Sequence, residues 1–127
     1  MSVPENLKYA KSHEWVRDDG DGVVTVGISD FAQEKMTELV YIELPEADRE
    51  IEAGDELAVV ESVKSASDIY APVSGTLIEA NAALEDDPTL VNSAPYSDGW
   101  MFQIRLSDPG TLDALMNAAD YEKLISE

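Results

Sequence analysis

The chain has 127 residues, 44% of them hydrophobic, which suits one domain whose core needs no staples. It contains no cysteine, and this excludes disulfides, thiolate metal sites and a cysteine nucleophile. Eight Lys and Arg against 27 Asp and Glu give a formal charge of −19, so nucleic acid and anionic membranes are poor partners.

The acidity has two explanations that charge alone does not separate. It suits docking to partners with basic faces, and it equally suits solubility or adaptation to high salt. No apolar run reaches membrane-spanning length, and residues 1–6 form neither a basic signal-peptide start nor an Arg-rich transit peptide. We expect a monomeric cytoplasmic protein that binds neither nucleic acid nor membrane.

Segments of β-branched residues alternate with turn signals along the first half of the chain. Ser29 and Asp30 form a good N-cap for a short helix that ends near Met36. The other elements predicted here are an irregular start (2–7), an extended segment (9–17), a hairpin turn (18–22) and two strands (23–28 and 40–44).

The second half continues with strands and ends in helix. Residues 46–53 look like a polar connection with an isolated Ile51. The later predictions are strands at 76–80 and 100–106, an acidic connection with helical turns (81–99), a helix capped at 107–109 whose buried stripe is Leu112, Leu115, Met116 and Ala119, and a further helical turn at 121–127. This order favours a small β-sandwich or barrel with helical caps.

Lys64 lies near the turn between two short strands in residues 56–75. The next cations along the chain are Arg49 and Arg105, so Lys64 has no basic neighbours in sequence. A lysine at such a turn holds a hydrated amine on a four-carbon stem, away from the flanking strands. A solubilising surface lysine is the ordinary explanation, and the rarity of cations here argues against it.

No catalytic constellation accompanies this lysine. His13 is the only histidine and lies in an extended segment, so a packed or surface histidine is the better interpretation. The Ser-x-x-Lys motif fails because Glu61 occupies the required position. The chain has no phosphate-binding Gly-rich loop and no metal-ligand spacing. One singled-out lysine without an acid–base pair indicates a carrier rather than an enzyme.

Residues 61–68 and 71–75 resemble the lipoyl-attachment segment of the glycine cleavage system H-protein family. Other segments resemble landmarks of that family in the same order, and together they run from about Lys8 to Leu124. These segments are 8–9, 12–16, 26–30, 32–33, 40–45, 81 with 84, 90–92, 95–96 and 99–100.

The resemblance implies a mainly β fold, a barrel-sandwich hybrid of two small antiparallel sheets with peripheral helices, including one at the C-terminus. It implies one lipoyl-carrier domain over 1–127, with a lipoyl-binding core at about 23–106 and a helical region at about 108–126. Lipoate on the Lys64 amine would shuttle an aminomethyl group from glycine decarboxylase (P protein) to aminomethyltransferase (T protein). Dihydrolipoyl dehydrogenase (L protein) would reoxidise the lipoyl dithiol.

The resemblance also implies roles for other residues. Glu61 and Gly75 match positions that lipoate-attaching enzymes recognise, although a solvated strand residue and a turn glycine remain alternatives. Ser12, Glu14 and Asp68 match residues of a cleft that shelters the aminomethyl arm, the alternative being an ordinary polar rim. A lipoate reservoir or relay that donates lipoyl groups to other lipoyl domains, and an unmodified interaction domain, also remain open.

Overall fold

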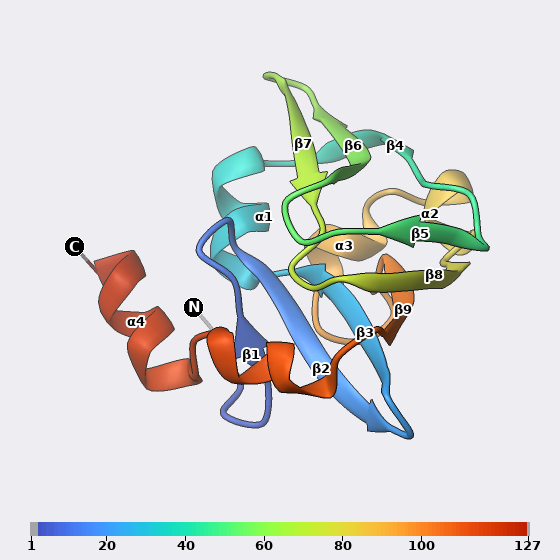
Figure 1. Cartoon of the computed structure of the whole chain (residues 1–127). Helices are drawn as coiled ribbons and strands as arrows, with labels where there is room; N and C mark the ends of the chain where they lie inside the picture. Colours follow the sequence, from blue (N-terminus) through green and yellow to red (C-terminus); the bar gives the residue numbers. More distant parts are fainter. Residues whose placement is uncertain (1–2, 127) are drawn as a thin grey trace.

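The computed structural model describes residues 3–126, which form two antiparallel β-sheets with helices around them (Figure 1). The six-stranded sheet has the order β1 (Lys8–Tyr9), β2 (Glu14–Gly20), β3 (Val23–Ile28), β9 (Phe102–Leu106), β8 (Gly75–Ala80) and β5 (Arg49–Ile51). The three-stranded sheet has the order β4 (Leu39–Glu43), β6 (Glu56–Ser62) and β7 (Ala66–Tyr70). Within residues 3–126 neither sheet closes into a barrel. The predicted fold class is confirmed.

The main core lies between the two sheets. Strand side chains alternate between faces, so the apolar positions of each strand turn to the same side. Ile42, Val60 and Ile69 from the smaller sheet are buried in one cluster with Val26 and Ile104 from the larger one. The smaller sheet is therefore fixed to the larger one through its inner face.

A second cluster attaches the C-terminal helix, α4 (Ala118–Ser126), to strands β1 and β2. The rings of Tyr9 and Tyr121 stack with centroids 4.5 Å apart and planes inclined by 5°. Trp15 pairs with Gly27 in the ladder, and a Cβ at Gly27 would lie 2.7 Å from the indole ring. Gly27 is thus the residue that leaves room for Trp15.

The short helices follow their sequence signals. Helix α1 (Asp30–Met36) begins at Ser29, whose Oγ accepts a hydrogen bond from the Ala32 amide, as the N-cap prediction requires. Helices α2 (Ala83–Asp86) and α3 (Leu90–Ser93) are the helical turns expected in the long acidic connection. No helix between residues 3 and 126 combines the length and apolar character that crossing a membrane would need.

Three predictions of local structure are wrong. The extended segment predicted at 9–17 is interrupted by a turn, in which the His13 amide donates to the Ala10 carbonyl (3.0 Å). Residues 49–51, predicted as polar connection, form β5, because β8 offers a ladder partner and buries Ile51. The helix predicted after residue 108 is a 3₁₀-helix (Pro109–Ala114) that ends before Met116. Met116 exchanges two backbone hydrogen bonds of 2.8 Å with Tyr9, which extends the chain there, and Ala119 is exposed rather than part of a buried stripe.

Gly75 begins β8 between β9 and β5 and is buried. A Cβ there would overlap the Arg105 carbonyl oxygen and lie 3.0 Å from Cγ2 of Ile104. Backbone of a central strand has no room to yield, so we expect Gly75→Ala to lower the free energy of unfolding by about 1–3 kcal/mol. Urea denaturation measures this change.

The matched control is Gly110→Ala. A Cβ at Gly110 would meet only the end of the Asp108 side chain, at 3.2 Å, so we expect a much smaller change there. Equal losses in the two variants would contradict the packing role of Gly75.

Candidate functional site

Lys64 lies at the tip of the β6–β7 hairpin, which projects from the rest of the molecule at the top of Figure 1. The side chain of Ser62 holds the tip in shape. Its Oγ accepts hydrogen bonds from the amides of Lys64 (3.2 Å) and Ser65 (3.1 Å), and the Ser62 amide donates to the Ser65 carbonyl (2.8 Å). These hydrogen bonds fix the backbone conformation of the turn, although its side chains are mostly exposed.

The lysine side chain is exposed, and within residues 3–126 no salt bridge joins it to a carboxylate. Glu61 is also exposed and lies on β6, paired with Tyr41 on one side and Ala66 on the other. The Val63 amide donates to the Glu38 carbonyl at 3.3 Å and so ties the tip to the start of β4. Lys64 and Glu61 thus present their charged groups at one end of the smaller sheet.

Ser12 and Glu14 meet at a tight turn between β1 and β2. The Ala10 amide donates to the Glu14 carbonyl (2.9 Å), and the His13 amide donates to the Ala10 carbonyl (3.0 Å). His13 has φ 77°, a left-handed conformation that reverses the chain between the two side chains. The Ser12 hydroxyl donates a short hydrogen bond to Oε1 of Glu14.

Glu14 is a buried carboxyl group, with 1% of its surface exposed, while Ser12 beside it is open to solvent. Burial raises the pKa of Glu14, because the charged form loses its hydration. Hydrogen bonds from Ser12 and from the backbone of Tyr70 oppose this rise. The backbone at Tyr70 is at the end of β7, so the buried carboxyl connects the two sheets.

His13 anchors this turn to the C-terminal helix. Its Nδ1 lies 2.8 Å from the Tyr121 hydroxyl, which is also 2.6 Å from Oγ of Ser29. The imidazole packs on Phe31, with ring centroids 5.0 Å apart, and burial lowers the His13 pKa. Burial raises the pKa of Tyr121 to about 12, so its hydroxyl keeps its proton at neutral pH. His13 is a packed histidine with a structural task.

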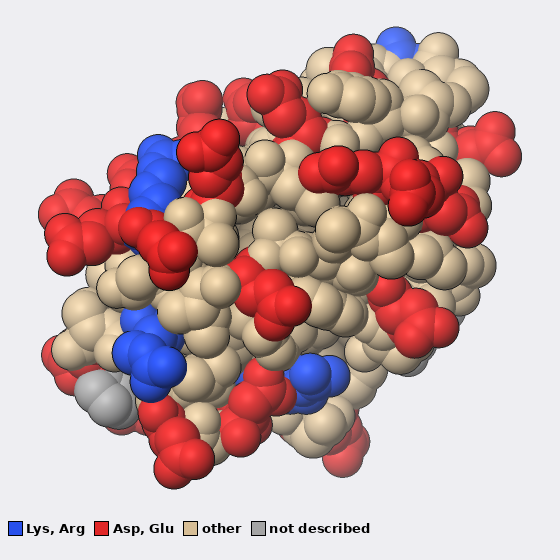
Figure 2. Space-filling view, turned by 90° about the vertical axis from the view of Figure 1, so that its right-hand side faces the viewer, with Lys and Arg blue, Asp and Glu red and all other residues tan. Residues whose placement is uncertain are grey.

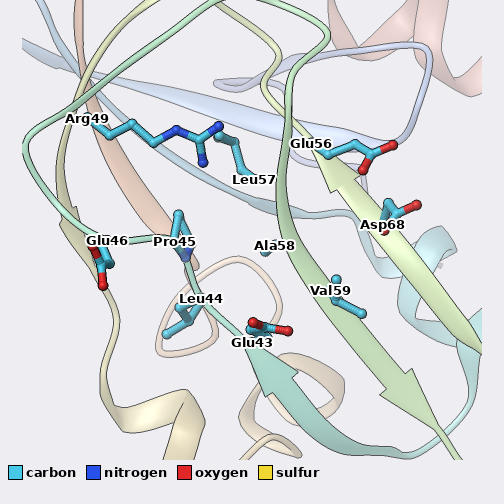
Figure 3. A pocket seen from close by; sticks show the side chains of 10 residues that line it. All are labelled: Glu43, Leu44, Pro45, Glu46, Arg49, Glu56, Leu57, Ala58, Val59 and Asp68. Atoms are coloured by element: carbon cyan, nitrogen blue, oxygen red, sulfur yellow. The ribbon is translucent and has the colours of Figure 1, made fainter.

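Asp68 lies elsewhere, on the outer face of the smaller sheet. It is exposed. Glu43, Val59 and Asp68 lie side by side on the neighbouring strands β4, β6 and β7 (Figure 3). These residues line a hollow of about 410 Å³ into which Arg49 also reaches. Neither Ser12 nor Glu14 is among the residues that line it. The structure therefore brings Ser12 and Glu14 together and places Asp68 in a hollow that neither of them lines.

Gly75 lies beyond the far end of β7, on the larger sheet and away from the hairpin tip (Figure 1). Tyr70 and Tyr121 are neighbours of the predicted site that were not expected from the sequence. A signal for Tyr121 existed: Ala118, Tyr121 and Ile125 follow helical spacing along one face of the C-terminal segment. No group of three or more His, Asp or Glu side chains suited to a metal ion occurs within residues 3–126.

Comparisons with known proteins agree on one family. The family model described as glycine cleavage H-protein matches residues 7–127. The glycine cleavage system H protein of Alcanivorax borkumensis is 57% identical over 123 residues, covering 97% of this chain and 95% of the relative. The H protein of Chromohalobacter salexigens is 52% identical over 124 residues, covering 98% of this chain and 95% of the relative.

A solved structure is also similar. The crystal structure of a glycine cleavage system H protein from Mycobacterium marinum matches with a TM-score of 0.89 at 34% identity. The match covers 98% of this chain and all of the other, so the similarity includes the lysine hairpin and the C-terminal helix alike.

The raised pKa of Glu14 predicts a pH dependence of stability. The folded protein holds this proton more tightly than the unfolded chain, so the charged form weakens folding. As pH rises from about 4.5, the ordinary pKa, through the raised value, we expect the wild type to lose stability relative to Glu14→Gln. Above the raised pKa the difference should stay constant. Urea denaturation of both proteins across this range measures the difference.

Ser12→Ala is the matched control. Ser12→Ala removes a hydrogen bond that favours the carboxylate, so the pKa of Glu14 should rise further. The loss of stability relative to Glu14→Gln should then continue to a higher pH than in the wild type. Parallel stability curves for the wild type and Glu14→Gln over the whole range would contradict the raised pKa.

Proposed function

The chain belongs to the glycine cleavage H-protein family, the lipoyl carriers of the glycine cleavage system, and we propose that it carries lipoate on Lys64. The family resemblance of the sequence is thus confirmed. The observation that supports Lys64 is its position: an exposed amine at the tip of a projecting hairpin, with no ion pair to any residue between 3 and 126. Such an amine is reachable by an acylating enzyme and leaves its attached group free to move.

The residues present fit a lipoyl group. The amine is primary and accessible, and the turn around it is held by Ser62 through backbone contacts that acylation of the side chain leaves intact. When bound, lipoate supplies a disulfide that accepts an aminomethyl group, and the dithiol left after the group is passed on is later reoxidised. The chain itself supplies the tether, the surface that partners recognise, and a place for the cargo.

We propose that the protein is a carrier subunit rather than an enzyme. Its partners would be the glycine decarboxylase, the aminomethyltransferase, the dihydrolipoyl dehydrogenase and a lipoate-attaching enzyme. The family supports a role beside other glycine cleavage components. A tether on Lys64 raises the local concentration of the cargo at each of these enzymes without requiring a new contact.

Ser12 and Glu14 are proposed to receive the cationic cargo. An ammonium beside the buried Glu14 carboxyl would favour its charged form and donate hydrogen bonds to it, while Ser12 offers a second acceptor at the solvent edge. Asp68 would act as an outer anionic contact, since it is exposed and lies with Glu43 in a hollow that Ser12 and Glu14 do not line. Burial at Glu14 would exclude water from the cargo.

Glu61 and Gly75 are proposed to act differently in lipoate attachment. Glu61 lies three residues before Lys64 and is exposed, so it is placed for direct contact with the attaching enzyme. Gly75 is buried between β9 and β5, so its contribution would be to keep β8 packed.

Replacement of Lys64 tests the function. Lys64→Arg keeps the positive charge but removes the primary amine, so we expect complete loss of lipoylation and of glycine–carbon dioxide exchange with a glycine decarboxylase, with folding unchanged. Peptide mass mapping and the exchange assay measure the two effects. The matched control, Lys11→Arg at another exposed lysine, should keep both.

Lipoyl groups on another lysine of Lys64→Arg would refute the site. A wild type that is lipoylated on Lys64, fails with its glycine decarboxylase and donates lipoyl groups to other domains would instead be a lipoyl relay.

Glu14→Gln tests the proposed place for the cargo. Glutamine keeps the size of the side chain but cannot carry the negative charge, so we expect the aminomethyl group to be lost several-fold faster from the loaded protein. Asp68→Asn should have a smaller effect because Asp68 is exposed. Release of formaldehyde and ammonia measures the rate, and the Glu14 carboxyl ¹³C shift reports any cation beside it. Equal rates, or an unchanged shift on loading, would exclude Glu14 from the site.

A further inference from the structure

Exposed apolar side chains concentrate beside Lys64. Within residues 3–126, four large hydrophobic side chains are exposed: Val63 (67%), Val40 (54%), Tyr41 (51%) and Leu124 (36%). Three of them, Val40, Tyr41 and Val63, flank the tip of the lysine hairpin, and we call them the tip strip. Single exposed apolar residues are normal, but a group of them rimmed by polar residues marks an interaction surface.

The fold makes the tip strip continuous. Leu39 pairs with Ser62 and Tyr41 pairs with Glu61, so β4 runs beside the end of β6. The register shifts between Leu39 and Tyr41, and this irregularity leaves both Val40 and Tyr41 exposed. The hydrogen bond from the Val63 amide to the Glu38 carbonyl holds Val63 next to the start of β4 and so joins it to Val40 and Tyr41. In addition, β4 is an edge strand of its sheet, so no further strand among residues 3–126 pairs with its outer edge.

Carboxylates surround the tip strip. Glu38, Glu43 and Glu61 are all exposed and lie on the same two strands or directly beside them. The wider surface is also acidic: Figure 2 shows one face with many Asp and Glu side chains and few Lys or Arg. A partner that covers the strip must therefore offer an apolar centre with basic side chains around it.

We propose that the tip strip is the docking surface for the ATP-dependent enzyme that attaches lipoate to Lys64. The inference rests on the proposed function, in which Lys64 is the attachment site. An unmodified lysine extends about 6 Å from its Cα, so an acylating enzyme must come into contact with the tip. The lipoyl-lysine arm extends about 14 Å, so enzymes that use the arm have no such need.

The attachment reaction uses lipoate and ATP, which the enzyme first joins as lipoyl-AMP with release of pyrophosphate. The neutral Lys64 amine attacks the carbonyl carbon of lipoyl-AMP. A carbon–nitrogen bond forms, the bond from carbon to the AMP oxygen breaks, AMP leaves with the electron pair, and a proton passes to solvent. Val63, next to Lys64, lies within the footprint of any enzyme that performs this step.

The test compares apo protein variants as substrates of a lipoate–protein ligase supplied with lipoate and ATP. Tyr41→Ser and Val63→Ser each remove one side chain of the tip strip, and we expect kcat/KM to fall roughly tenfold in each. The loss should lie mainly in KM. Leu124→Ser is the matched control, because it removes an exposed apolar side chain from α4 and should leave kcat/KM unchanged. Thermal denaturation checks that all variants remain folded.

Added salt gives a second readout. For the wild type, KM should rise with ionic strength, because carboxylates around the strip attract a basic partner surface. Glu43→Gln, a charge removal without loss of size, should weaken this dependence.

The outcomes separate the two proposals. If the ligase does not acylate wild-type Lys64, the proposed function fails and the docking inference fails with it. If wild type, Tyr41→Ser and Val63→Ser are acylated with equal kcat/KM, the docking inference alone is wrong. If acylation is equal but pre-lipoylated Tyr41→Ser loses exchange with glycine decarboxylase, the strip serves that enzyme instead. A wild-type dimer that Tyr41→Ser dissociates, with kcat/KM unchanged, would assign the strip to a second copy.

Discussion

Burial of three side chains on the inner face of the smaller sheet, Ile42, Val60 and Ile69, determines where the lysine hairpin lies. These three residues come from the three strands of the smaller sheet and pack into the core shared with the larger sheet. Side chains alternate along a strand, so their burial forces the neighbouring positions to the outer face. A one-residue slip of β6 would turn Glu61 inward and Val60 outward. The core thus fixes both the register of the hairpin and the residues it presents around Lys64.

A second constraint acts on the Ser12–Glu14 turn. The left-handed His13 is costly for a residue with a Cβ, and neighbouring packing must hold it in place. Tyr121 supplies that packing from the C-terminal helix, through the hydroxyl beside Nδ1 of His13 and the ring stacked on Tyr9. The last helix is therefore coupled to the position of a carboxyl group near the first strand. This explains why a short helix at the chain end carries a fully buried tyrosine.

Much of this arrangement was predictable from local patterns. The apolar alternation in residues 40–44 predicted β4, and the cap at Ser29 predicted α1. The hairpin at Lys64 was predicted from two apolar segments around a run of small polar residues. The outward position of Asp68 was also available, since it precedes the apolar Ile69 by one residue. By contrast, β5 has only three residues and depends on β8 for its ladder. The bridge at Met116 depends on Tyr9, over a hundred residues earlier, which no local window contains.

The burial of Glu14 was not predictable for a different reason. Composition places glutamates at the surface, and an ordinary polar rim was the natural expectation at this position. Its neighbours Trp15 and Val16 are buried as well, so the strand is covered on both faces and the usual alternation gives no signal. A buried carboxyl group weakens folding unless it has partners, and Ser12 and the Tyr70 backbone supply them only in part. Such a local exception is typical of a functional position.

The tip strip shows how an edge strand can carry a docking surface without pairing with other chains. An exposed edge with apolar side chains invites pairing with other chains, and Val40 and Tyr41 on β4 have this character. Two features oppose such pairing. The irregular register at Val40 disrupts the flat template that another strand would need. The carboxylates around the strip repel a second copy of this acidic chain, and they attract a basic partner. The same charges therefore disfavour self-association and favour an enzyme that must approach Lys64, so a high net negative charge and an apolar contact surface are compatible in one small carrier.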